Sequence, residues 1–181
     1  MRRSVSQRGF GLIEVLIAVL ILTVGLVGLA SLFGVSVATT YQAQESLLAK
    51  QLAREALESI FTARNTHQIT FDQIRNVAAG GIFLDGLLPV TTPGPDGLVG
   101  TADDGPEVQM VLAGPDGVVG TGDDVIRRLT GYRRQIQIDP IIRPDGSIDA
   151  NLRQVTVTIQ YPSVRGPALN YRVGTYVSRF R

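Results

Sequence analysis

The stretch RGFGLIEVLIAVLILTVGLVGLASL, residues 8–32, decides the fold of this chain. It carries one acid, Glu14, at the head of an apolar run, and no charged residue occurs from Val15 to Gln44. About 20 apolar residues suffice for a helix across the hydrocarbon core of a bilayer. The sequence therefore predicts a transmembrane helix with a carboxylate near its amino-terminal end.

The flanking residues predict the orientation of this helix. Arg2, Arg3 and Arg8 precede it, and such a basic flank favours a cytoplasmic leader with everything downstream outside the cytoplasm. The small residues in GLASLFGVSVATT, 28–40, leave a cleaved secretory signal peptide as an alternative. Glu14 argues against that alternative, because an unpaired carboxylate inside the segment costs several kcal/mol, or takes up a proton.

Glu14 therefore implies a cationic partner. Cleavage of the chain between Gly9 and Phe10 would create a new α-amino group four residues before Glu14 and would remove the basic leader. A new cation and the retained anion would then stand at the same membrane boundary.

The motif RGFGLIEVLIAVLIL, residues 8–22, resembles the class III signal of type IV pilins and pseudopilins. The resemblance implies that prepilin peptidase cuts after Gly9 and N-methylates Phe10. It also implies that Glu14 pairs with the amino group of a neighbouring subunit during assembly. The continuation, residues 16–32, is similar to the type IV pilus modification (PilV) group of minor pilins. Gly11 departs from the pattern, which more often has threonine there.

This resemblance implies a structural subunit rather than an enzyme: a minor pilin incorporated into or priming a type IV pilus. Its partners would be prepilin peptidase, other pilins or minor pilins, and the inner-membrane assembly platform. The chain would first be a single-pass inner-membrane protein and then part of a pilus or of a periplasmic pseudopilus. Two alternatives stay open: a minor pseudopilin of a type II secretion system, and a membrane-tethered calcium-binding or adhesive module that never polymerises.

The helical pattern continues beyond the membrane segment. We expect residues 1–9 to form the leader, 10–40 the transmembrane or filament-core helix, 41–66 an amphipathic continuation, and 67–181 a globular domain. In that continuation two adjoining rows of apolar residues recur at helical spacing, so this half should lie on a soluble domain. The rows are Leu48, Leu52, Ala56, Ile60 and Ala49, Ala53, Leu57, Phe61.

An acidic repeat occupies the middle of the chain. GPDGLVGTADD, residues 94–104, returns as GPDGVVGTGDD, residues 114–124, with nine of eleven positions identical. Pro-Asp-Gly is a strong turn signal, because proline presets φ and glycine accepts positive φ. The repeats flank a short predicted strand, residues 107–112.

Two interpretations of the repeat carboxylates stay open. Calcium takes six to eight oxygen ligands, and flexible Asp/Gly loops can supply them. The loops lack the pattern of an EF-hand, and the alternative is that the acids are solvated turn charges. The candidate calcium ligands are Asp96, Asp103, Asp104, Asp116, Asp123 and Asp124.

The carboxyl-terminal part predicts an antiparallel sheet over about residues 126–181. RRQIQID, RQVTVTIQYP and NYRVGTYVSRF alternate with period 2 and are rich in Val, Ile, Thr and Tyr. Residues 155, 157, 159 and 161 should face the helix, and residues 154, 156, 158 and 160 should face solvent. The predicted fold class is α+β, with a long amino-terminal helix packed on this sheet, as the resemblance to pilins also implies.

Charge and composition exclude several kinds of site. Ten arginines follow residue 125, and interleaved tyrosines suggest a nucleic-acid surface. The favoured interpretation is a solvated strand face paired with acidic loops, so we expect no nucleic-acid partner. The chain has no cysteine and one histidine, His67, which excludes a disulfide framework and leaves little for a zinc site or a catalytic triad.

Overall fold

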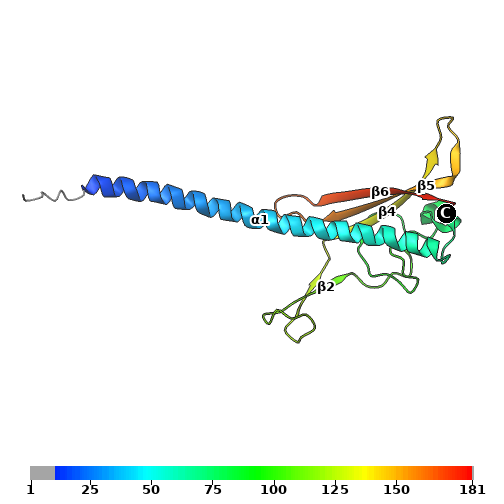
Figure 1. The fold of residues 1–181 in the computed structure, drawn as a ribbon, viewed down its shortest axis with the longest axis horizontal. Helices are drawn as coiled ribbons and strands as arrows, with labels where there is room; N and C mark the ends of the chain where they lie inside the picture. Colours follow the sequence, from blue (N-terminus) through cyan, green and yellow to red (C-terminus); the bar gives the residue numbers. More distant parts are fainter. Residues whose placement is uncertain (1–10, 181) are drawn as a thin grey trace, which may run out of the picture. The chain divides into compact units, whose positions relative to one another are not determined.

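The computed structural model describes residues 11–180, so the predicted cleavage site at Gly9 and Phe10 lies outside the described residues. Helix α1 spans Leu12–Asn65, and the chain divides into a unit up to residue 42 and a unit from residue 43 onward. All strands belong to the second unit (Figure 1). One long helix and an antiparallel sheet confirm the predicted α+β fold class.

The second unit is built on the carboxyl-terminal half of α1. Its buried side chains follow the predicted stripe, because a helix presents residues three and four apart on one face. Leu48, Leu57 and Phe61 pack at the edge of the same core. The buried apolar residues of the helix are Ala49, Leu52, Ala53, Ala56, Ile60 and Ala63.

The sheet that covers this stripe has four antiparallel strands in the order β1-β4-β5-β6. Turns around residues 143–147 and 163–168 join the three long strands, as their Pro-Asp-Gly and Gly-Pro signals predict. In Figure 1 these three strands run along the carboxyl-terminal half of α1. The strands are β1 Leu88–Pro89, β4 Arg133–Ile142, β5 Ile148–Tyr161 and β6 Leu169–Ser178.

Strand β5 confirms the predicted alternation on its inner face. Val155, Val157 and Ile159 are fully buried, and Tyr161 is nearly so. The prediction for the outer face is wrong at Thr156, which is buried, because β5 has a neighbouring strand on each side.

The domain also contains a two-stranded sheet, which the sequence did not predict as separate from the main sheet. Strand β2, Gln109–Leu112, pairs with β3, Val125–Arg128, and the second repeat forms the loop between them. The prediction placed the beginning of the main sheet near residue 126, but β3 belongs to this hairpin. Two short 3-10 helices, η1 Phe71–Gln73 and η2 Val77–Ala79, complete the unit.

Two arginines correct the prediction of a wholly solvated basic face. Arg134 and Arg153 are both buried. Arg153 donates to the carbonyl oxygens of Phe71 and Ile74, and its guanidinium lies 4.2 Å from the centre of the Phe71 ring. A guanidinium that bonds carbonyls and stacks on an aromatic ring keeps partners for its charge inside a core.

Candidate functional site

Glu14 lies in the first turn of α1, and its backbone N–H donates to the carbonyl oxygen of Gly11 at 3.0 Å. A carboxylate in the first turn interacts favourably with the positive end of the helix dipole. The side chain is exposed, so Glu14 is available to a partner from outside the described chain.

The apolar half of α1 is uncovered. Its most apolar 18-residue window has a mean hydropathy of 2.8, and none of that window is buried. Among the described residues α1 alone is long and apolar enough to cross a membrane, by length and composition. A core helix of a soluble protein passes the same test but is mostly buried, whereas this segment requires lipid or another protein as cover.

The two acidic repeats fold into the same local structure. We call residues 94–104 the first loop and residues 114–124 the second loop. In each, the second glycine has positive φ, +71° at Gly97 and +72° at Gly117. In each loop an aspartate side chain accepts a hydrogen bond of 2.8 Å from the backbone N–H two residues later. Asp96 accepts from Leu98, and Asp116 accepts from Val118.

The last aspartates of the two loops also bond alike. Asp104 accepts from the N–H of Gly100 at 2.8 Å, and Asp124 accepts from that of Gly120 at 2.6 Å. Asp103 and Asp123 each accept from the threonine hydroxyl two residues earlier. The shared sequence therefore encodes a shared network of turn hydrogen bonds.

The surroundings of the first loop are those of a core. Leu98 and Val99 are both 0% exposed. Asp104 accepts from the Thr91 hydroxyl, and its Oδ2 lies 4.0 Å from Nη2 of the buried Arg134. Burial lowers the pKa of Arg134, while the carboxylates of Glu55 and Asp104 act in the opposite direction. The first loop is thus fixed by a buried charge pair and two apolar side chains.

The second loop has none of this cover. Val118 is 55% and Val119 61% exposed, although they occupy the positions of Leu98 and Val99. Asp124 has no arginine opposite it in the described chain, and its Oδ1 is inaccessible and without a hydrogen-bond partner there. Exposed valines on the adjoining strands, Val111 and Val125, extend the apolar surface of this hairpin.

The six predicted calcium ligands remain distributed over the two loops. Within residues 11–180, no group of three or more acidic or histidine side chains is placed to hold a metal ion. Several of these carboxylates instead accept hydrogen bonds from backbone N–H groups and threonine hydroxyls. In Asp123 the hydrogen bonds, first that from Thr121, lower the pKa, so this carboxylate is ionised at neutral pH. Calcium binding by the loops stays a prediction.

Glu45, an acid of α1, anchors the β2–β3 hairpin to the helix. It is buried, and it accepts hydrogen bonds from Arg127 of β3 and from the hydroxyl of Tyr132. Burial, followed by the bond to Glu45, raises the pKa of Tyr132, which therefore keeps its proton. The position of Glu45 in the sequence could have predicted its burial, because Glu45 precedes Ala49 and Leu52 of the buried stripe by four and seven residues.

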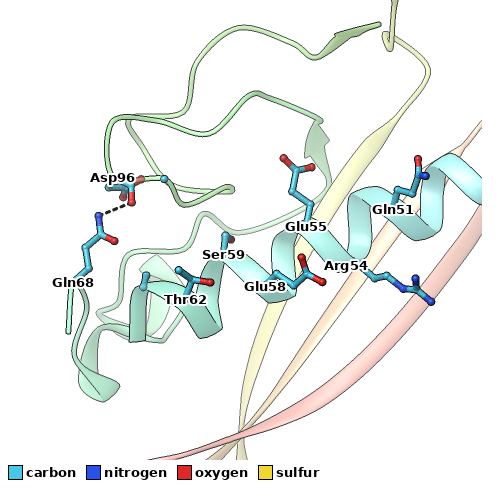
Figure 2. A pocket seen from close by; sticks show the side chains of 10 residues that line it. Gln51, Arg54, Glu55, Glu58, Ser59, Thr62, Gln68 and Asp96 are labelled. Atoms are coloured by element: carbon cyan, nitrogen blue, oxygen red, sulfur yellow. Dashed lines mark hydrogen bonds between the residues drawn. The ribbon is translucent and has the colours of Figure 1, made fainter. Parts of the chain in front are cut away.

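A polar pocket of about 500 Å³ lies between α1 and the first loop. Figure 2 shows Glu55, Ser59 and Thr62 on the helix, with Asp96 on the loop opposite. Gln68 donates from Nε2 to the carbonyl oxygen of Asp96 at 2.6 Å, the dashed line in Figure 2. This hydrogen bond ties the first loop to the segment that follows α1.

Comparison with known proteins identifies the amino-terminal segment. Residues 5–30 match the family model described as the prokaryotic N-terminal methylation motif. No curated protein and no solved structure matches the chain. The matched residues include Gly9, Phe10 and Glu14, and they support a type IV pilin-like family and a substrate of prepilin peptidase. The motif points to a structural subunit and is consistent with membrane anchoring.

Proposed function

We propose that this chain is a minor pilin, cleaved after Gly9, methylated on Phe10, and inserted through α1 into a type IV pilus that it helps to prime. The methylation motif at residues 5–30 supports this proposal, together with an apolar helical segment that nothing in the described chain covers. In the membrane lipid covers that segment, and in a filament other subunits would cover it. The domain from residue 43 onward would stand outside the cytoplasm.

Glu14 has a defined role in this proposal. Its carboxylate stands in the first turn of α1 and is exposed. After cleavage, the new amino group of a neighbouring Phe10 would supply the cation that an acid in an apolar surrounding requires. The ion pair would form between subunits and would guide each helix to its place in the filament.

The change Glu14→Ala tests this role. The variant should be processed, because the cleavage site is intact, but it should be lost from sheared pili. Glu58→Gln is the matched control, because Glu58 is an exposed acid of the same helix within the domain, and this variant should enter pili like the parent chain. Normal incorporation of Glu14→Ala into pili would contradict the proposed role.

A minor pseudopilin of a type II secretion system shares the motif and is the second candidate. It predicts the same processed amino terminus, with the chain absent from sheared pili and required for secretion. A membrane-tethered module that never polymerises is the candidate of a different class. It predicts a chain that begins at Met1 and a variant Glu14→Ala that behaves as the parent chain.

A further inference from the structure

The first loop shows which surface accepts this kind of loop. Leu98 and Val99 enter the core, and a Cβ built on Gly100 would lie 2.8 Å from Cδ1 of Ile136 on β4. Arg134, two residues before Ile136, approaches the last aspartate of the loop. The surface that holds the first loop therefore combines an isoleucine and an arginine of β4.

The second loop has the same turn structure as the first. The apolar side chains that the first loop buries are exposed in the second. Val118 and Val119 are exposed, as are Asp116 and Asp123. Adjacent exposed apolar side chains rimmed by charge mark an interaction site on a protein surface. The loop thus presents an acidic and apolar surface that has no receptor in the described chain.

A pocket of about 380 Å³ elsewhere in the same domain has the matching chemistry. We call it the arginine pocket; its walls include Ile138 and Pro140 of β4, Ile148 of β5, and three arginines, Arg75, Arg153 and Arg179. Ile138 follows Ile136 by two residues and so lies on the same side of β4. Ile148, at the rim, is 62% exposed.

The arginine pocket carries excess positive charge. One carboxylate, Asp72, serves all three arginines, at 3.6 Å from Arg75, 3.6 Å from Arg153 and 2.8 Å from Arg179. Asp149, the acid that lines the pocket itself, already pairs with Arg143 at 3.1 Å. Burial, and then the like charge of Arg75, lowers the pKa of Arg153, so a further anion would be favourable here.

We infer that the second loop of one copy docks in the arginine pocket of a second copy of this chain. Val118 and Val119 then meet the exposed Pro140 and Ile148 at the mouth of the pocket, where Ile138 is buried beneath them. The loop aspartates meet Arg75 and Arg179, the two more exposed of the arginines that share Asp72. The contact joins two different surfaces, so it is head-to-tail and repeats from copy to copy. It deepens the proposed function, on which it rests, because a filament is built from such contacts.

Cysteine crosslinking in the full chain tests the contact, because the parent chain has no cysteine. Two differently tagged chains, Val119→Cys and Ile148→Cys, are produced together in membranes and treated with a short thiol crosslinker. A dimer that carries both tags is expected. Leu169→Cys, which is exposed on β6, replaces Ile148→Cys as the control and should give a far weaker mixed dimer.

The charge contribution is tested with amides, which remove the charge and keep one acceptor oxygen on each side chain. Asp116→Asn with Asp123→Asn in the second loop should reduce the mixed dimer strongly, whereas Asp96→Asn with Asp103→Asn in the first loop should leave it unchanged. A mixed dimer no stronger than the Leu169→Cys control overturns the inference, and so does equal loss with both amide pairs.

The mass of the amino-terminal segment, measured in the same membranes, distinguishes a failure of the docking contact from a failure of the proposed function. Methylated Phe10 without the mixed dimer overturns the docking contact and leaves the proposed function standing. The mixed dimer on a chain that begins at Met1 supports the contact and overturns the proposed function.

Discussion

The first and second loops share nine of eleven residues and the same turn hydrogen bonds, yet the apolar pair of the first loop is buried and that of the second is exposed. Val99 is 0% exposed and its counterpart Val119 is 61% exposed. The difference lies outside the repeats, in the isoleucine and arginine of β4 that receive the first loop. Sequence thus determines the shape of such a loop, and its surroundings determine what the loop does.

Helix α1 shows the same contrast on a larger scale. Its residues 49–63 place their apolar stripe on the sheet, whereas its residues 12–38 leave theirs uncovered. Apolar surface that a chain leaves uncovered over such a length requires an environment that covers it. The uncovered helix and the uncovered loop are therefore the two regions through which this chain would meet its partners.

The largest predicted difference between the loops concerns their last aspartates. Asp104→Ala should lower the free energy of unfolding by about 3 kcal/mol, because it removes the carboxylate paired with the buried Arg134 and the acceptor of the Thr91 hydroxyl and the Gly100 N–H. Asp124→Ala should change it by less than about 1 kcal/mol, because only one backbone N–H loses its acceptor. Urea unfolding of the full chain in detergent, followed by tyrosine fluorescence, measures both. Equal losses would show that the loops are not distinguished by Arg134.

The apolar positions should give a smaller difference. Val99→Ala removes two buried methyl groups and should cost about 2 kcal/mol. Val119→Ala changes an exposed side chain and should stay within about 0.5 kcal/mol. The same unfolding experiment applies, and a cost for Val119→Ala near that of Val99→Ala would mean that the second loop is covered by its own domain.

Calcium should give the smallest effect, if the loops bind it. With the millimolar to tenth-millimolar dissociation constants of extracellular calcium modules, 1 mM calcium would stabilise the fold by about 0.4 to 1.4 kcal/mol. Asp104 of the first loop is paired with Arg134, whereas the carboxylates of the second loop have no arginine partner in the described chain, so Asp123→Asn should weaken binding more than Asp103→Asn. Calorimetric titration measures this, and an absence of binding heat would eliminate the calcium hypothesis.

Much of the fold follows from periodicity in the sequence. The apolar rows of α1 and the alternation in β4, β5 and β6 gave the elements and their buried faces, because both patterns depend only on local geometry. The separate β2–β3 hairpin was missed, because alternation indicates which residues form strands but not which strands pair. The pairing of Leu88 and Pro89 with Arg134 and Arg133 was missed because it joins residues far apart in the chain.

The candidate sites divide in the same way. Gly9, Phe10 and Glu14 form a contiguous motif and could be named from sequence, whereas the buried Arg134 and Arg153 were expected on a solvated face. An arginine on a strand enters a core only where distant carbonyls, rings or carboxylates receive it, and a strand pattern does not contain those groups. For the same reason, two nearly identical loops could not be told apart before the structure.

We propose that this chain becomes a filament subunit only after its leader is removed. The intact mass of the chain, isolated from native membranes and from sheared pili, tests this directly. We expect a chain that lacks nine residues and begins at N-methylated Phe10 in both fractions. A chain that retains Met1 in the membranes and is absent from the pili would contradict it.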